Sequence, residues 1–140
     1  MTATKNIETD SYKVTLLTPH IIENDFFDNV VIDIPLVDQI KKINSELSDG
    51  KFYGVLTLFG ISTEITPETR AHISKASFHK NNLFAAVVAQ SIAQKIVGNF
   101  YLRINKPKNT TRIFNDRTSA LNWLEKELDA YLKNTSAQQN

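Results

Sequence analysis

Histidines are the residues of this sequence best suited to proton transfer or metal binding, and there are three: His20, His72 and His79. No two of them form an H-x-x-x-H pair, and His72 and His79 share a helix face only if one helix carries both. A zinc or iron site needs a further ligand, for example Glu68, four residues before His72. The chain has no cysteine, which excludes thiol catalysis, disulfides and cysteine-ligated metals. We therefore predict no metal ion and no cofactor.

Nucleophiles and glycine-rich loops are the next candidates for chemistry. The four glycines match neither the phosphate loop G-x-x-x-x-G-K-[ST] nor the dinucleotide fingerprint G-x-G-x-x-G. Gly60-x-Ser62 begins like a nucleophile elbow, but Glu64 stands where that motif needs its second glycine. An acidic cluster has structural explanations, in a turn and at a helix start; its members are Asp25, Asp28, Asp33 and Asp38. The sequence therefore predicts a protein that is not an enzyme.

Charge is distributed unevenly, although 16 basic and 15 acidic residues leave a net charge of only +1. Residues 5–38 hold two basic and seven acidic residues, whereas residues 70–112 hold eight basic residues and no acidic one. Four of these cations fall at a predicted helix end and in the loop after it: Arg103, Lys106, Lys108 and Arg112. They either complement the helix dipole or form an anion-binding edge for a phosphorylated ligand, a lipid headgroup or an acidic protein. Aromatic residues do not alternate with them, so we expect no nucleic-acid partner.

The length of 140 residues suits a single domain. We expect a polar N-terminal segment at residues 1–10, one domain over residues 11–133 and a flexible tail over residues 134–140. The N-terminus is charged and lacks the apolar core of a signal peptide. The longest apolar run, residues 83–89, has seven residues, whereas a transmembrane helix needs about twenty. We therefore expect a cytoplasmic protein without a transmembrane segment.

The elements that position these residues follow from hydrophobic spacing. In the first half, strands are predicted at residues 12–17, 20–27 and 30–34, with a turn at Asp28-Asn29. The spacing becomes helical after Pro35, and Gly50 stands where a left-handed C-terminal cap belongs. The apolar stripe of this helix should face the core: Leu36, Ile40, Ile43 and Leu47.

In the second half, a buried strand is predicted at residues 52–59, and Thr66-Pro67 begins a half-buried helix that runs to about Phe78. Its weak apolar stripe consists of Thr69, Ile73 and Ala76. Residues 83–89 are apolar on both faces, as in a central strand covered on both sides. The helix over residues 91–105 should bury one apolar stripe: Ile92, Ile96, Phe100 and Ile104.

The chain closes with a short strand at residues 111–114 and a helix that Asp116 caps. The inward side chains of that helix should be Leu121, Leu124, Leu128 and either Tyr131 or Leu132. The order of elements predicts an α/β domain with an N-terminal β-hairpin and mostly parallel strands after it. We expect a mixed sheet of about four to six strands with about four helices.

Several segments of the second half together form a recognisable set of motifs: Thr66-Pro-Glu-Thr-Arg70, the strand at residues 83–89, Gly98-Asn-Phe-Tyr-Leu-Arg-Ile-Asn-Lys-Pro107, Thr111-Arg-Ile-Phe114, Asp116, and Ala120-Leu-Asn-Trp-Leu124. In this order they resemble the SpoIIAA-like branch of the STAS (STAS/SEC14-like) domains. The resemblance covers about residues 50–128 in motifs and residues 12–49 only in the order of elements. It implies a single STAS-like α/β domain and a non-enzymatic binding or regulatory role.

The sequence departs from the family at the regulatory loop. STAS regulators carry an Asp-Ser-Ser/Thr-Gly loop with a phosphorylated serine, whereas residues 60–67 here read GISTEITP. Three hydroxyls of this segment are candidate regulatory sites: Ser62, Thr63 and Thr66. A phosphate there would lie near a helix N-terminus, where the dipole stabilises negative charge. The alternative is that Thr66 only caps the helix.

Two functional hypotheses follow. In the first, the protein binds a protein partner, or a second copy as a homodimer, through the helix at residues 67–78 and the loop at residues 60–66; the contact residues would be Ile61, Ile65 and Ile73. In the second, it binds an anionic lipid or a small amphiphile, with aromatic residues and the cations at residues 103–112. An aromatic-lined cavity could take an acyl chain, although aromatic residues on core-facing elements more often pack against each other.

Overall fold

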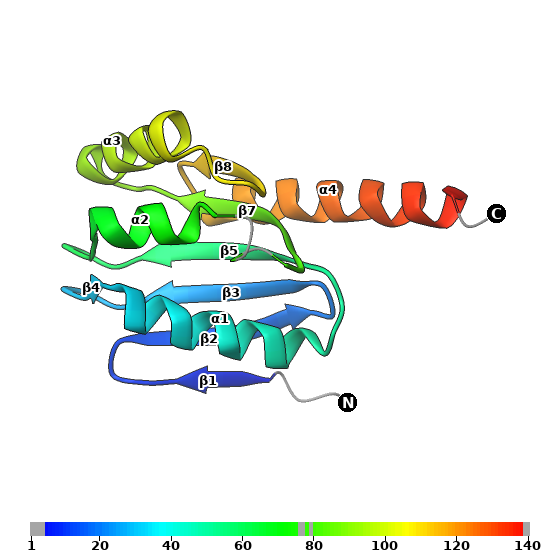
Figure 1. The fold of residues 1–140 in the computed structure, drawn as a ribbon, viewed down its shortest axis with the longest axis horizontal. Coiled ribbons are helices and arrows are strands. Elements are labelled where there is room, and N and C mark those ends of the chain that lie inside the picture. The colour runs from blue at the N-terminus through cyan, green and yellow to red at the C-terminus, as the bar shows by residue number, and fades with distance from the viewer. Residues whose placement is uncertain (1–4, 76–77, 79, 139–140) are drawn as a thin grey trace.

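The computed structural model describes residues 5–75, 78 and 80–138, and it arranges them as a six-stranded sheet with helices on both faces (Figure 1). The sheet order is β1-β2-β3-β5-β7-β8. Its strands are β1 (Asn6–Glu8), β2 (Tyr12–Thr18), β3 (Ile21–Phe26), β5 (Tyr53–Phe59), β7 (Asn82–Val88) and β8 (Thr110–Phe114). The helices are α1 (Ile34–Ser48), α2 (Pro67–Ile73), α3 (Ile92–Phe100) and α4 (Arg117–Gln138), and a π-helical turn, η2 (Tyr101–Asn105), continues α3.

The strand directions confirm the predicted mixed sheet. The pairs β1–β2 and β2–β3 are antiparallel, and the pairs β3–β5, β5–β7 and β7–β8 are parallel. Each parallel pair is joined through a helix, as parallel neighbours require. The predicted strand at residues 30–34 is shortened to β4 (Val31–Ile32), which pairs with β6 (Glu64–Ile65) in a separate two-stranded sheet. Neither β1 nor β6 was predicted, because two or three residues carry no measurable periodicity.

Helix α1 forms where the sequence predicts it and packs on one face of the sheet. The Asp33 carboxylate caps its N-terminus by accepting a hydrogen bond from the Leu36 N–H at 3.0 Å. The C-terminal cap shifts by one residue: Asp49 is the first residue in the left-handed region (φ 53°), and Gly50 follows it there (φ 77°). Ile40 is buried as predicted, whereas the three leucine and isoleucine side chains beside it, Leu36, Ile43 and Leu47, are partly buried against the same core.

Helix α4 covers the opposite face of the sheet. Its buried side chains, Ala120, Leu124 and Leu128, pack with Leu56 of β5 and Ala86 of β7. Gly54 permits this close approach, because a Cβ atom there would lie 2.9 Å from Leu124 Cδ2. The predicted N-terminal cap is confirmed, since Asp116 Oδ1 accepts from the Ser119 N–H at 2.8 Å. The helix continues to Gln138 and therefore includes part of the segment that was expected to be a tail.

Helix α2 is shorter than predicted: it ends at Ile73, not near Phe78. The Ser74 hydroxyl donates to the Ala71 carbonyl at 2.7 Å, a local contact that competes with the helical ladder. The predicted stripe residue Ala76 and the candidate His79 lie outside the described residues. The start at Thr66-Pro67 is confirmed, and Thr69 of the stripe is fully buried.

Helix α3 is where the sequence-based prediction of burial was wrong. The helix and its π-helical extension cover the predicted residues, but Ile92, Ile96, Phe100 and Ile104 are all exposed. The reason is the contact that seats α3 on β8. Gly98 faces Ile113 so closely that a Cβ atom at Gly98 would lie 2.3 Å from Ile113 Cδ1. In α-helical geometry at 100° per residue, Gly98 lies about 160° around the helix from Ile96, so seating α3 through Gly98 turns the apolar stripe outward.

The orientation of α3 also affects the burial of β7, which was predicted to be covered on both faces. On the face that α4 covers, Ala86 and Val88 are buried, as expected for a central strand. On the other face, Leu83, Ala85 and Val87 are only partly buried. Strand β7 is therefore not fully covered on both sides, because the apolar side chains of α3 do not lie over it.

Candidate functional site

The loop after β5 carries the predicted regulatory hydroxyls and Ile61, and the neighbouring turn at Asp28 holds it in place. Asp28 Oδ1 accepts from the Ile61 N–H at 2.7 Å, and the Asn29 N–H donates to the Ile61 carbonyl at 2.9 Å. A glycine is required at position 60, because a Cβ atom there would lie 2.5 Å from the Asp28 nitrogen. The loop is therefore a fixed turn that presents Ile61 at the surface.

The three candidate hydroxyls have different environments. Thr66 Oγ1 accepts from the Thr69 N–H at 3.1 Å and lies 2.6 Å from Thr69 Oγ1, so it is the N-cap of α2. The Thr63 hydroxyl donates to the Phe27 carbonyl. Ser62 is exposed at the tip of the loop in the left-handed region (φ 58°). Two of the three hydroxyls thus have structural hydrogen bonds, and Ser62 is the accessible one.

The three isoleucines predicted as partner contacts differ in exposure. Ile61 is 75% exposed. Ile65 and Ile73 are partly buried and pack against the core beneath α1. A substitution of Ile65 or Ile73 therefore acts on the core as well as on any contact surface.

Among the residues that the structure describes, the largest group of exposed apolar side chains lies on α3 and η2, and we call it the α3 stripe. Its members and their exposed fractions are Ile92 (79%), Ile96 (64%), Val97 (36%), Phe100 (49%) and Ile104 (58%). Gln94 Nε2 donates to the Gly60 carbonyl at 3.3 Å, which places the first turn of α3 beside the loop that carries Ile61. A sequence reading recognises these residues as a helical stripe but assigns them to the core.

Helix α2 borders the α3 stripe through Arg70. The Arg70 guanidinium lies over the Phe100 ring at 5.7 Å from its centroid, and Nη1 donates to the Ile65 carbonyl at 2.8 Å. Next to Phe100, Tyr101 turns inward, and burial raises the pKa of its hydroxyl well above the usual range. Phe100 is therefore fixed between α2 and solvent, at the edge of the stripe.

The four predicted anion-binding residues are all exposed, but they divide between the two faces of β8. Arg103 and Lys106 lie at the end of α3–η2, where Lys106 takes a left-handed conformation (φ 51°), and Lys108 follows in the loop. Arg112 is in β8 and stacks over Phe114, which packs on the α4 face of the sheet. Since neighbouring strand residues point to opposite faces, Arg112 lies on the other side of the sheet from α3.

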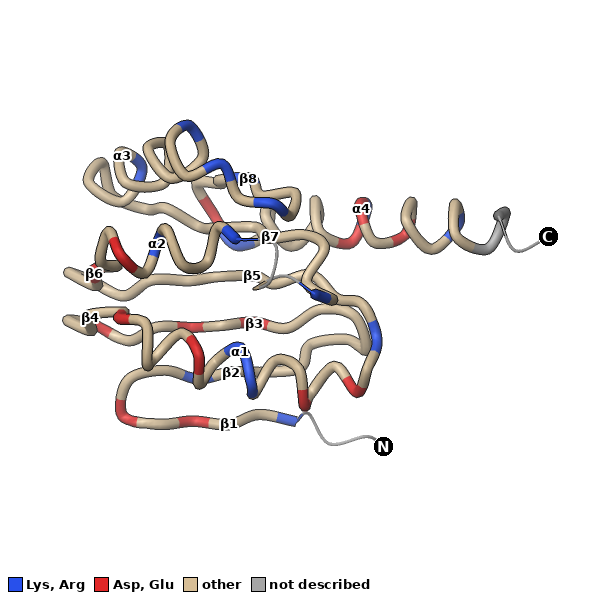
Figure 2. The backbone as a smooth tube through the Cα atoms, viewed as in Figure 1, with Lys and Arg blue, Asp and Glu red and all other residues tan. Residues whose placement is uncertain are grey.

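The sheet order separates the acidic and basic parts of the chain (Figure 2). The acidic first third forms β1, β2 and β3 at one edge, and the basic segment forms α3 and β8 at the other. At the acidic edge, burial and then the neighbouring Glu23 raise the pKa of Asp25. The near-zero net charge thus conceals a molecule with an acidic edge and a basic edge.

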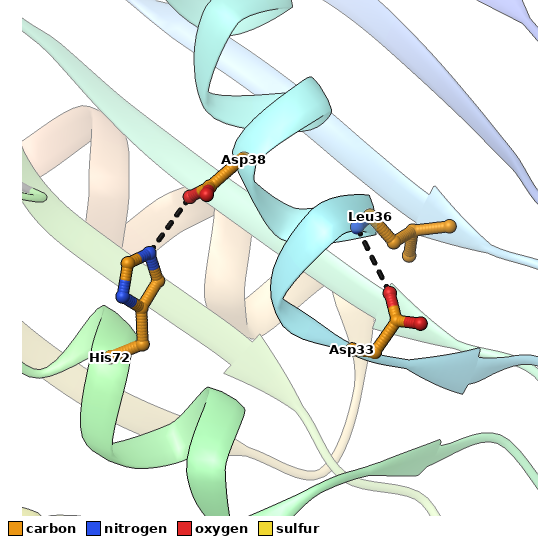
Figure 3. A network of polar contacts seen from close by, with 4 residues as sticks. All are labelled: Asp33, Leu36, Asp38 and His72. Carbon is orange, nitrogen blue, oxygen red and sulfur yellow. Dashed lines mark hydrogen bonds and ion pairs between the residues drawn. The ribbon is translucent and has the colours of Figure 1, made fainter.

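A second polar feature lies between α1 and α2 (Figure 3). His72 Nε2 and Asp38 Oδ1 are 2.8 Å apart across an open cleft of about 480 Å³. The cleft is lined by Asp38, Lys41, Lys42, Ser45, His72 and Phe78. Among the described residues, no three histidine or acidic side chains gather as a metal site would require. The contact ties the two helices together across the surface of the molecule.

The comparisons with known proteins identify the class of this α/β domain. A solved structure with a SpoIIAA-like fold, an uncharacterised protein of the DUF3478 family from Shewanella loihica PV-4, superposes with a TM-score of 0.51 and 12% sequence identity. The match covers 87% of this chain and 92% of the other. The fold is therefore SpoIIAA-like, as the motifs of the second half predict.

The family follows from the sequence match. The chain belongs to the family described as a domain of unknown function, DUF7793, whose model matches residues 16–128. No curated protein matches the chain. No helix in the described part of the chain is long and apolar enough to span a bilayer.

Proposed function

We propose that this SpoIIAA-like domain is a non-enzymatic binding module that acts through protein–protein contacts, with the α3 stripe as its contact surface and Ile61 beside the first turn of α3. The observation that carries the proposal is the exposure of five large apolar side chains along one helix. Contiguous exposed apolar surface of this kind marks interaction sites in soluble proteins.

The rest of the described surface makes a useful contrast. Apart from Ile61, which lies beside the first turn of α3, its other exposed large apolar side chains are Ile7 on β1, Val31 on β4 and the adjacent pair Tyr131 and Leu132 on α4. Isolated apolar residues on a surface are ordinary. A stripe with helical spacing is different, because one partner can cover all of it at once.

Two polar pairs that the fold brings together have structural roles. The Asn24 and Asn44 side-chain amides, both buried, donate to each other's carbonyl oxygens at 2.9 and 3.0 Å. Asp116 accepts from both the N–H and the hydroxyl of Ser119. These contacts stabilise the fold, and the proposal assigns no reaction to them.

Photo-crosslinking in the native cell tests the proposal. A photo-reactive amino acid replaces Ile96 in one variant and Ile7, on the opposite edge of the sheet, in a matched control. We expect protein adducts at position 96 that are missing at position 7. The absence of a protein adduct at position 96, or the same adducts at both positions, would overturn the proposal.

The alternative function is binding of an anionic lipid or a small amphiphile. The observation that favours it is the combination of the α3 stripe with Lys95 and Arg103, in a segment without acidic residues. Amphipathic helices at membrane interfaces combine such features. Flotation with vesicles of phosphatidylcholine and phosphatidylserine at low salt tests this function. The lipid-binding function is supported if the wild type floats with the vesicles and Ile96→Asp does not. It is rejected if the wild type does not float.

A further inference from the structure

We infer that the α3 stripe binds an acidic amphipathic helix of a partner protein, which lies along α3 and η2. This inference rests on the proposed function and adds the chemistry of the partner. The apolar face of the partner helix would cover the stripe, and its carboxylates would lie beside Lys95 and Arg103. The argument comes from the shape of the stripe, its flanking charges and the poor fit of a second copy of this chain.

The shape of the stripe suits a helix. From Ile92 to Phe100 the α-helix advances eight residues, which corresponds to about 12 Å at the α-helical rise, and Ile104 lies in the π-helical turn that follows. A partner helix of three to four turns, with apolar residues at positions i, i+3 or i+4, and i+7, matches the combined length of α3 and η2. Arg70 and α2 border one side of the stripe at Phe100 and give it a defined edge.

The charged side chains of α3 and η2 themselves are all positive. Lys95, Asn99 and Arg103 follow at positions i, i+4 and i+8, so they form a polar row along one flank of the stripe. Lys106 continues the positive charge beyond the end of η2. Residues 70–112 contain no acidic side chain that could neutralise this row from within the segment. A partner that matches it carries Asp or Glu along the facing side of its own helix.

A second copy of this chain is a poor occupant. An antiparallel pair of α3 helices would bring Lys95 and Arg103 of one copy toward the same cations of the other, and like charges across an interface oppose binding. In the described part of the chain, the other exposed apolar side chains lie on separate elements and form no matching stripe. Like charges therefore disfavour a symmetric antiparallel pair of α3 helices, and the described residues offer no second apolar stripe for a head-to-tail contact, which favours a different protein.

A bilayer is also less suitable than a helix. The Arg70 guanidinium covers one face of the Phe100 ring, which restricts the entry of that ring into an acyl layer. The helical segment itself supplies only two cations, whereas interfacial helices are rich in Lys and Arg on their polar face. Vesicle binding is therefore measured as well, as a contrary outcome of the test.

Three synthetic peptides test the inference with the full-length protein. The probe is an 18-residue helix with a leucine stripe and Glu and Ala elsewhere; one control scrambles its order, and the other replaces every Glu by Lys. Binding is measured by fluorescence anisotropy, and the site is mapped by amide chemical shifts in nuclear magnetic resonance spectra. We expect saturable binding of the Glu peptide, shifts confined to residues 92–105 and their neighbours, and at least tenfold weaker binding of both controls.

Two variants then test the apolar stripe and its flanking cations separately. Ile96→Asp should weaken binding of the Glu peptide at least tenfold. The double variant Lys95→Glu/Arg103→Glu should also weaken it at least tenfold, and should strengthen binding of the Lys peptide. Ile7→Asp on β1 and Lys42→Glu on α1 are matched controls that should leave binding within about twofold. Unchanged thermal unfolding of each variant shows that the fold is intact.

Each contrary outcome has one meaning. Equal binding of the Glu and Lys peptides, or shifts outside α3, overturns the inference. Self-association in sedimentation experiments that Ile96→Asp abolishes also overturns the inference and assigns the stripe to a second copy. Vesicle binding that Ile96→Asp abolishes overturns it as well and assigns the stripe to a bilayer. A protein crosslink at position 96 without binding of the Glu peptide overturns only the acidic-helix partner, whereas the lack of any protein crosslink overturns the proposed function.

Discussion

Helices α1 and α3 have the same kind of sequence pattern but lie in opposite environments. Both carry apolar residues at intervals of three and four, and both follow a side-chain cap, Asp33 for α1 and Ser91 for α3. The α1 stripe lies on the sheet, where Ile40 is buried. The α3 stripe faces solvent, because α3 contacts β8 through Gly98. Amphipathic spacing therefore predicts a helix and an apolar face, but not what covers that face.

The sharpest test of this comparison replaces one isoleucine in each stripe by alanine. Ile40→Ala should lower the free energy of unfolding by about 2–5 kcal/mol, because it leaves a cavity in the core. Ile96→Ala should change it by less than about 0.5 kcal/mol, because the side chain is already in water. Urea titration measures both values. Similar losses in the two variants would contradict the exposed orientation of α3.

Two glycines extend the comparison from side chains to the backbone. Gly60→Ala should lower the free energy of unfolding by about 1–3 kcal/mol, because the new methyl group meets the backbone of Phe27 and Asp28, which cannot move aside. Gly98→Ala meets only the end of the flexible Ile113 side chain, and alanine gains about 1 kcal/mol of helix propensity. We therefore expect the smaller loss, or none, at Gly98. The same urea titration distinguishes the two, and a larger loss at Gly98 would show that α3 cannot adjust on β8.

A polar pair makes the core beneath α1 sensitive in a way that α3 is not. Asn44→Ala removes the partner of Asn24 and leaves a buried amide unsatisfied, which should cost about 1–3 kcal/mol. The exposed Asn99 on α3 is the matched control, and Asn99→Ala should be nearly neutral. If Asn44→Ala were also neutral in urea titration, water would have to replace the lost hydrogen bonds, and the packing of α1 on β3 would be looser than described.

The smallest expected effect concerns pH and compares an acidic residue in β3 with one that caps a helix. Hydrogen bonds from Ser119 lower the pKa of Asp116, so its stabilising effect is present above the unfolded value of about 3.8 and is lost as the pH falls through the lower folded pKa. Burial raises the pKa of Asp25, so its ionised form destabilises the fold once the pH rises above the unfolded value.

Unfolding measured at pH values from 2 to 7 tests the direction of both pH effects on stability. Relative to wild type, Asp116→Ala should lose most stability at the upper end of this range, and Asp25→Asn should gain most there. The opposite ordering would contradict the environments of the two carboxylates in the structure.

Local features of the fold could be predicted because local interactions determine them. The Asp33, Thr66 and Asp116 caps are each made by a side chain with a backbone N–H three residues further along. The end of α2 was wrong by several residues, because the Ser74 hydroxyl competes with the helix there. Strands β1 and β6 were missed, since two or three residues gain their strand character only from the partner they pair with.

The candidate site depended on long-range contacts and was therefore less predictable. Ile61, Ile65 and Ile73 have the same chemistry, and only the packing of α1 and β6 shows that Ile61 alone is well exposed. The α3 stripe was visible in the sequence as apolar residues with helical spacing. Its exposure was not, because a stripe facing a core and a stripe facing a partner have the same spacing.

The amino-acid sequence by itself determined the helices and most of the strands, the caps, the partition into an acidic and a basic segment, and the SpoIIAA-like class. The helices, strands and caps depend on neighbours in the chain, through hydrogen bonds and hydrophobic periods of a few residues, whereas the SpoIIAA-like class followed from the resemblance of motifs in the second half to that family. Tertiary structure alone decided that β1 and β8 form opposite edges, which separates the charges, and that Gly98 rather than the isoleucines of α3 meets the sheet. Burial is a relation between segments far apart in sequence, and the close approach of Gly98 to Ile113 determines it here.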